Sequence, residues 1–178
     1  MARPRAAPAP LCAHRHKDAN DMDMDFRITG LDAGRFSHLF GLSDAELARH
    51  RALRKTCDEK PGFPCRVSLE DAEPGEPVLL LNYEHLPVDS PYRSSHAIYV
   101  RERELPPFDE VNTIPPALQP RLLAVRGIDA DGMIVAAEVV EGRALAPLVR
   151  QLFADAAIAY LHAHFARRGC FAARIDRA

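Results

Sequence analysis

The sequence lacks the features that mark several classes of protein. It has no tryptophan, four tyrosines and eight phenylalanines in 178 residues, too few aromatics for a stacking platform that binds single-stranded nucleic acid. Its 23 Lys and Arg are balanced by 25 Asp and Glu, so there is no basic excess of the kind that nucleic-acid-binding domains carry. No apolar run approaches the roughly 20 residues that span a bilayer. We therefore expect neither nucleic acid nor a membrane as a partner.

Signatures of export and of well-known catalytic sites are also missing. The opening residues are rich in Arg, Pro and Ala and have no apolar segment of the kind found in export signals. The four cysteines, Cys12, Cys57, Cys65 and Cys170, form no CxxC pair. We therefore expect reduced thiols and a cytoplasmic location. The sequence contains no glycine-rich phosphate loop, no GxSxG and no paired-carboxylate motif, so it does not identify a reaction.

Composition divides the chain into two parts. Residues 1–21 are poor in hydrophobic residues and broken by prolines, so they are predicted to form a disordered tail. Residues 22–178 are long enough to bury a substantial core. We predict that they form a single α+β domain.

Two segments have helical patterns. Ser43 and Glu46 form a capping box, which predicts a helix that runs to roughly Lys55. Residues 144–153 place apolar side chains at i, i+3, i+4 and i+7, which predicts a second helix with one apolar stripe. Pro147 is compatible with this helix if it lies in the first turn.

The other periodic segments predict strands. The 65–69 segment alternates, 78–81 is continuously apolar, and Asp-Ala-Asp-Gly at 129–132 is a hairpin signal. The expected fold is therefore α+β, with a mostly antiparallel sheet of about five to seven strands, two main helices and a C-terminal β-hairpin. The predicted strands are residues 65–69, 78–81, 96–101, 122–128, 133–140, 158–165 and 170–177.

The C-terminal hairpin allows a prediction of register. A three-residue loop, 167–169, would place Gly169 in the left-handed position that such a loop requires. It would also put the apolar residues of both strands on one face. The expected pairs are Phe165 with Phe171, Ala163 with Ala173, and Leu161 with Ile175, and the opposite face pairs His162 with Arg174 and His164 with Ala172.

His162 and His164 are candidate metal ligands, because strand spacing directs both imidazoles to the same side. Cys170 at the loop end of the same face is a candidate third ligand, and a divalent metal is the candidate cofactor. The alternative is a solvated face whose histidines bond to neighbouring carboxylates.

A second polar segment follows the predicted buried strand. Glu84 and His85 are candidates for a general acid/base pair or for ligands, with Arg174 as a further catalytic candidate. The alternative is turn chemistry with a Glu84–Arg93 ion pair. The candidates for binding a cofactor or ligand in this region are Asn82, Tyr92 and Arg93.

Cys65 shares its predicted face with Val67 and Leu69, which favours an inert buried cysteine. The functional alternatives are a thiol activated by Arg66 or a redox pair with Cys170.

Four motifs carry a resemblance to a known family: DEKPGFPCRVSLEDA at 58–72, LLLNYEH at 79–85, SPYR at 90–93 and GCFAAR at 169–174. With these motifs, the chain from Phe26 onward resembles the bacterial family called domain of unknown function 1203. The resemblance implies a small soluble bacterial protein and no particular activity. In that family the histidine pair is usually followed by Asn, whereas Phe165 follows it here.

Two functions from different classes remain open. The first is a soluble domain that binds a small molecule or a metal, or is an enzyme, through a polar site of His, Glu and Arg. The second is a non-catalytic protein-interaction or regulatory module whose polar faces contact a partner protein. Convergence of residues 82–85 with the His162/His164 face on one site would favour the first.

Overall fold

The computed structural model describes residues 24–178. The predicted tail, residues 1–21, lies outside the described residues, as do residues 22 and 23. Within the described part, nine strands and two α-helices are present, together with three short 3-10 helices. The main elements are β1 (Phe26–Thr29), α1 (Asp44–Arg49), β2 (Ala52–Thr56), β3 (Pro77–Leu86), β4 (Ser94–Arg101), β5 (Asp109–Val111), β6 (Leu122–Ile128), β7 (Ile134–Glu141), α2 (Leu145–Phe153), β8 (Tyr160–Phe165) and β9 (Phe171–Arg177).

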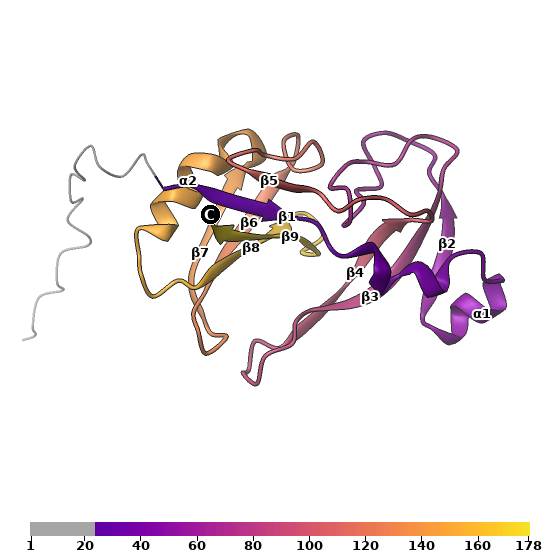
Figure 1. Ribbon diagram of the computed structural model, residues 1–178, viewed down its shortest axis with the longest axis horizontal. Coiled ribbons are helices and arrows are strands. Elements are labelled where there is room, and N and C mark those ends of the chain that lie inside the picture. The colour runs from indigo at the N-terminus through magenta and orange to yellow at the C-terminus, as the bar shows by residue number, and fades with distance from the viewer. Residues whose placement is uncertain (1–23) are drawn as a thin grey trace, which may run out of the picture.

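The strands form two antiparallel sheets (Figure 1). The larger has the order β5-β1-β9-β8-β6-β7, and the smaller has the order β2-β3-β4. The predicted antiparallel architecture, two helices and C-terminal hairpin are confirmed. The strand count differs, because six strands and three strands form separate sheets instead of one sheet of five to seven.

The first helix is shorter than predicted. The capping box is present, with the Ser43 N–H donating to the Glu46 carboxylate over 2.8 Å. The helix nevertheless ends at Arg49, and Arg51 takes a positive φ of 55°. The following residues, 52–56, pair with the buried strand β3 as β2. Pairing with a buried strand here outweighs the helical propensity of the segment.

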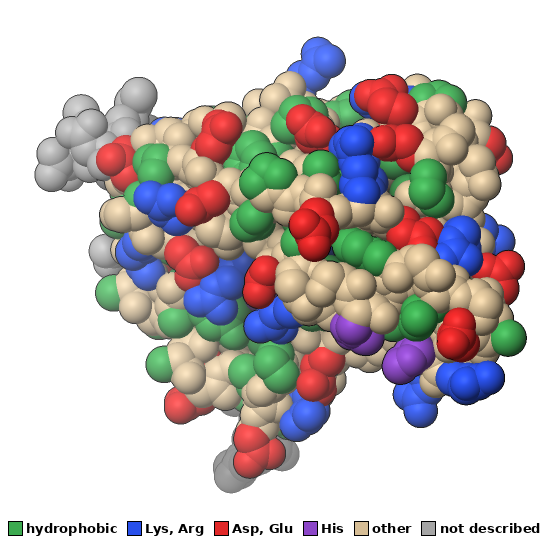
Figure 2. Space-filling model, turned by 45° about the vertical axis from the view of Figure 1, so that its right-hand side comes forward, with side chains coloured by type: hydrophobic (Ala, Val, Ile, Leu, Met, Phe, Trp, Pro, Cys, Tyr) green, Lys and Arg blue, Asp and Glu red, His purple; other side chains and the backbone are tan. Residues whose placement is uncertain are grey.

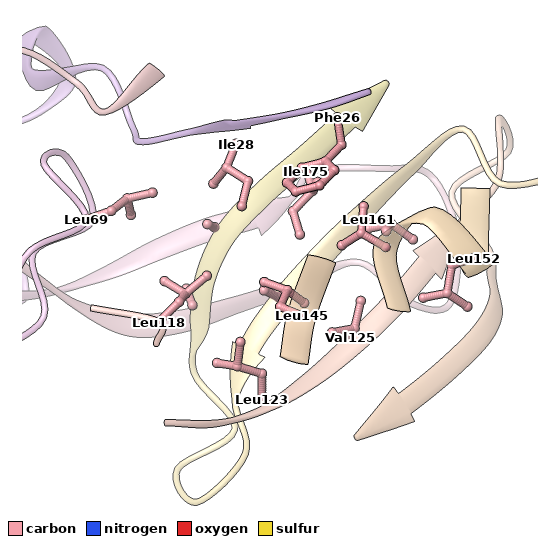
Figure 3. Close-up of a cluster of buried hydrophobic side chains, with 14 of the residues drawn as sticks. Phe26, Ile28, Leu69, Leu118, Leu123, Val125, Leu145, Leu152, Leu161 and Ile175 are labelled. Carbon is pink, nitrogen blue, oxygen red and sulfur yellow. The ribbon is translucent and has the colours of Figure 1, made fainter. Parts of the chain in front are cut away.

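The larger core lies between α2 and the six-stranded sheet (Figure 3). Leu145, Val149 and Leu152 of α2 are buried against Val125 of β6 and Leu161 of β8. The predicted second helix is therefore confirmed, and its apolar stripe covers one face of the sheet. The opposite face of β8 and β9 is left to be covered by other elements.

A second core supports the smaller sheet beneath α1. It contains Leu47 of α1, Leu79 and Leu81 of β3, and Ile98 and Val100 of β4. The long β3–β4 hairpin reaches from this core to the larger sheet. There Ser90 Oγ donates to the Gly132 carbonyl in the β6–β7 turn over 2.9 Å. This contact joins the tips of the two hairpins and holds β3 and β4 beside the larger sheet.

The strand predicted at residues 65–69 is wrong. Pro64 and Cys65 form isolated bridges, and the residues after them turn. Cys65, Arg66, Val67 and Leu69 are all buried, and Leu69 has a positive φ of 51°. The alternation in sequence therefore does not mark a half-buried strand, since Arg66 is enclosed as fully as its apolar neighbours.

The hairpin register is right over most of its length and wrong at its loop. Leu161 pairs with Ile175, His162 with Arg174, and Ala163 with Ala173, as predicted. Nearer the loop, the Phe165 N–H donates to the Cys170 carbonyl over 3.0 Å, so the loop has four residues, 166–169. Gly169 does take the expected left-handed conformation, with φ 72°.

A β-bulge reconciles the longer loop with the predicted pairs. His164 pairs with Phe171, not Ala172, and the register shifts between this pair and Ala163–Ala173. The extra residue of a bulge changes which face its neighbours occupy. Phe171 consequently joins the histidine face instead of the core beneath α2, and the predicted Phe165–Phe171 pair does not form.

Candidate metal centre

Three histidines from two sheets meet on the face of β8 opposite α2. Strand alternation directs Leu161 and Ala163 into the core and His162 and His164 to the other side. His85, near the end of β3, reaches them from the smaller sheet. The exposed fractions of His85, His162 and His164 are 6%, 2% and 0%, so the face that could have been solvated is in fact buried.

The three imidazoles are close enough to bind one ion. Each offers one ring nitrogen, and the three nitrogens lie within 4.8 Å of one another. Among the described residues, His85 Nδ1, His162 Nδ1 and His164 Nε2 are buried and have no hydrogen-bond partner. Buried polar atoms are nearly always paired, so three unpaired nitrogens at one place indicate a site for a ligand.

The neighbours of two rings determine which nitrogens are available. His164 Nδ1 lies 3.1 Å from the Gly169 carbonyl oxygen. Because a carbonyl can only accept, Nδ1 carries the proton and Nε2 keeps a lone pair. His85 Nε2 lies 3.2 Å from Ser94 Oγ, which leaves its Nδ1 for the cluster. An outer hydrogen bond that holds the ring in this way is typical of histidines that bind metals.

Aromatic rings enclose the cluster. His85 is stacked between His96, at a centroid distance of 4.6 Å, and Phe171, at 5.0 Å. Phe171 also meets His162 edge-on at 4.9 Å. The bulge in β9 is what brings Phe171 into this position. These apolar contacts shield the imidazoles from water.

Burial keeps the three histidines neutral. Desolvation, followed by the charges of neighbouring histidines and Arg126, lowers the pKa of His162 to about 2. Burial is also the main cause that lowers the pKa of His85 to about 4 and of His164 to about 3. Arg126 faces the cluster because it pairs with His162 across β6 and β8. Near neutral pH these imidazoles therefore have the uncharged form that a metal requires.

Cys170, the predicted third ligand, lies outside this group of three. Its Sγ lies 3.2 Å from Arg66 Nη2, and the residue lines a cavity beside the hairpin loop. The four-residue loop and the bulge account for this placement, since they direct Phe171 and not Cys170 towards the histidines. His162 and His164 are therefore brought together with His85.

The other predicted site residues are not members of the cluster, although Arg174 lies beside it as the cross-strand partner of His162. Glu84 is exposed and accepts from Arg93 Nε over 2.7 Å, which is the ion pair considered as the alternative. Asn82 and Tyr92 are exposed. Arg174 bonds to Asp176 and lies 3.8 Å from the centroid of the Tyr160 ring. The segment 82–85 therefore meets the histidine face through His85, and through Tyr83, whose ring lies 6.2 Å from that of Phe171.

Cys65 lies in the second core with an exposed fraction of 1%. Its Sγ accepts from the Val67 and Arg101 N–H groups, each at 3.4 Å. Cys57, Cys65 and Cys170 are free thiols. Arg66, expected beside Cys65, contacts Cys170 instead.

The sequence raised convergence of His85 with the histidine pair as an open question, but it did not predict that the three side chains meet, and it missed the enclosure by His96 and Phe171. No local signal connects His85 with His162 and His164, which lie 77 and 79 positions further along the chain. The available clue was alternation, which places Tyr83 and His85 on one face of β3 and pairs Tyr83 with His96 of β4. This clue identifies neighbours within one sheet and not contacts between sheets.

The chain belongs to the family described as "Protein of unknown function (DUF1203)", whose model matches residues 62–177. The match includes all three histidines of the cluster and confirms the resemblance seen in the sequence. No curated protein and no solved structure matches the chain significantly. Among the described residues, none of the helices is long and apolar enough to cross a membrane.

Proposed function

We propose that this protein binds a divalent transition-metal ion through His85, His162 and His164. The observation that carries the proposal is the convergence of three buried, neutral imidazoles, each with a buried ring nitrogen that lacks a hydrogen-bond partner. The same convergence supports a binding site over a protein-interaction module, because the shared residues face inward and not towards the surface. The cluster is unlike an exposed group of histidines, which water would satisfy.

The ligand set favours zinc and its neighbours in the transition series. The cluster offers nitrogen ligands and contains no carboxylate, whereas Mg²⁺ and Ca²⁺ prefer oxygen ligands. Zinc binds imidazole nitrogen at about 2.0–2.1 Å. The nitrogens, now within 4.8 Å of one another, would have to approach by small side-chain rotations.

Three protein ligands leave room for a further ligand. Tetrahedral zinc sites with three protein ligands keep their fourth position for water or substrate. Such an ion supplies Lewis acidity and lowers the pKa of a bound water. Arg126 places a positive charge beside the cluster, which would favour an anionic ligand at that position. The arrangement therefore suits hydrolytic or hydration chemistry on a small substrate.

The test is metal content and zinc affinity of the untagged full-length protein. Purified without chelator, the wild type should carry zinc, cobalt, nickel or copper at close to one ion per chain by plasma mass spectrometry. After removal and titration, the His162→Ala/His164→Ala variant should lose binding by 100-fold or more, by about 3 kcal/mol. His85→Gln should weaken it while preserving the fold.

Two other histidine pairs serve as controls. His38 and His50 form an exposed pair with ring centroids 5.8 Å apart, and His14 and His16 lie in the undescribed tail. Alanine variants of either pair should keep the ion. Circular dichroism would confirm that each variant is folded. Metal bound equally well by a folded His162→Ala/His164→Ala variant would contradict the proposal, as would a wild type that binds none of these ions.

A further inference from the structure

A cavity of about 610 Å³ lies beside the C-terminal hairpin loop. Its wall comes from residues 61–66, strands β3 and β4, residues 120–122 at the start of β6, the end of β7, and residues 165–170 of the C-terminal hairpin. A volume of this size is within the range of pockets that bind small molecules. Its side chains do not include those of the three candidate metal ligands. The charged and reactive residues in its lining are Arg66, Arg121, Glu141, Arg167, Arg168 and Cys170.

Arg66 is the most unusual member of this wall. Its exposed fraction is 1%, yet among the described residues no carboxylate pairs with it. Burial lowers its pKa to about 10, so the guanidinium still carries its charge near neutral pH. An unpaired charge in the interior is costly, and a nearby anion would offset that cost.

Only some of the N–H donors of Arg66 have a hydrogen-bond partner. Nε donates to the Phe171 carbonyl over 2.7 Å, Nη1 donates to the Pro64 carbonyl, and Nη2 donates to Cys170 Sγ over 3.2 Å. A guanidinium has five N–H donors, so two remain. None of the three partners is a carboxylate, in contrast to the buried Arg101, whose Nη2 donates to Glu76 over 2.7 Å.

The net charge of the cavity wall is positive. Arg121 is neutralised by Asp71, with Nη2 to Oδ1 at 2.6 Å. Arg66, Arg167 and Arg168 have no such partner among the described residues, and Glu141 is the single acidic residue of the lining. On the face shown in Figure 2, acidic and basic side chains are mixed. The cavity therefore concentrates positive charge in a way that this face does not.

We propose that this cavity binds a small organic anion that carries carboxylate or phosphate groups. Arg167 and Arg168, both exposed on the hairpin loop, would contact the anionic group directly, because arginine forks match both groups in geometry. The buried charge of Arg66 would strengthen the attraction from the inner wall, where the low dielectric increases its effect. This site shares His96 with the wall of the proposed metal centre, but it includes none of the three candidate metal ligands and does not depend on them.

Cys170 provides a direct readout of occupancy. It is partly exposed and lines the cavity, whereas Cys57 and Cys65 are each 1% exposed. In a Cys12→Ser background, the neutral reagent iodoacetamide should therefore label Cys170 first. Pyrophosphate and citrate, each compared with sodium chloride at equal ionic strength, are the probes. A probe at about ten times its Kd should slow labelling about tenfold, measured by peptide mass spectrometry.

A charge-reversal pair tests the assignment. Arg167→Glu/Arg168→Glu should abolish the protection, whereas Arg49→Glu/Lys55→Glu should retain it. The control pair makes the same change of charge at exposed positions that do not line the cavity. All four positions are exposed, so both variants should fold. Arg66→Gln, checked by thermal melting, should weaken protection as well.

The outcomes separate the ligand classes and the two sites. Protection by citrate alone would assign carboxylates, and protection by pyrophosphate alone would assign phosphates. Because both probes chelate metals, the experiment is repeated in the His162→Ala/His164→Ala variant, where protection should persist. No protection by either probe, or equal protection in both charge-reversed variants, would overturn the proposal while leaving the metal centre unaffected.

Discussion

Two regions of this protein bury polar side chains in opposite ways. Around the smaller sheet, arginines are paired with carboxylates: Nη2 of the buried Arg101 lies 2.7 Å from Glu76, and Nη2 of the half-buried Arg54 lies 2.6 Å from Glu102. Between β3 and β8, the polar groups are imidazoles, and no carboxylate belongs to their cluster. The first region pairs its charges with carboxylates, although Arg101 Nε is buried without a hydrogen-bond partner, whereas the second keeps its groups neutral and leaves a nitrogen of each imidazole unpaired.

This difference distinguishes polar groups that stabilise the fold from polar groups whose unpaired atoms could bind a ligand. A buried ion pair with full hydrogen bonding needs nothing further, and its loss mainly affects stability. Unpaired buried nitrogens and an unpaired guanidinium carry a free-energy cost that a ligand would remove. The histidine cluster and Arg66 therefore point to binding, while Arg101 and Arg54 point to structure.

A fall in pH should produce the largest difference between the two regions in their contribution to the unfolding free energy. The folded pKa values of His162 and His164, about 2 and about 3, lie below the ordinary value near 6.5. Their contribution is therefore complete above pH 6.5 and is lost as pH falls. Between pH 7 and pH 5 each should cost about 2 kcal/mol of unfolding free energy, and His85, whose pKa is lowered to about 4, should cost a similar amount, which brings the total to about 6 kcal/mol. Urea unfolding of metal-free protein at both values would measure the drop.

The carboxylate region should respond at lower pH. Hydrogen bonds from arginines lower the pKa of Glu76 and Glu102, so their contributions are present above pH 4.5 and are lost below it. In the His162→Leu/His164→Leu variant, about two thirds of the pH 7 to pH 5 loss should disappear, because His85 remains. The exposed-histidine variant His38→Gln/His50→Gln should keep it, since an exposed imidazole is solvated in both states. An unchanged drop in the leucine variant would contradict the assigned cause.

Removal of the carboxylate from one buried ion pair should have the next largest effect on the unfolding free energy. Asp71 is 6% exposed and accepts from Arg121 and from the Gly62 N–H. Asp71→Asn should cost about 3 kcal/mol, because it removes the charge of a buried carboxylate and leaves a partly buried guanidinium without its partner. The matched change Asp109→Asn removes an exposed pair with Arg27 and should cost no more than about 1 kcal/mol. Equal losses of unfolding free energy for the two variants, measured by urea unfolding, would contradict the distinction between the buried and the exposed ion pair.

The smallest change in unfolding free energy is expected in the hairpin loop 166–169, which lies between the histidine cluster and the cavity. Gly169 has φ 72° with open space around its Cα, and its carbonyl contacts His164. Gly169→Ala should therefore cost about 1 kcal/mol through backbone strain alone, and Gly169→Asn should cost less. Neither should alter zinc affinity, because the carbonyl is retained. A large loss of affinity would show that the turn itself positions His164.

Local patterns were enough to predict much of the fold. The capping box at Ser43, the turn at Gly132 and the apolar stripe of α2 depend on neighbours in sequence, and all are present. Most of the last hairpin register followed from matching apolar faces. The errors occur where tertiary contacts compete with local preference: the early end of α1, the buried turn at 65–69 and the bulge beside Phe171.

The sequence by itself determined that His162 and His164 point the same way, because strand geometry alternates side chains over two residues. Only the tertiary structure decided that this face is buried and that His85 completes it. The β3–β4 hairpin places His85 there because the two sheets pack against each other. No periodicity in the sequence predicts that contact. The same packing placed Cys170 beside Arg66, since the bulge that admitted Phe171 to the histidines left the cysteine on the cavity wall.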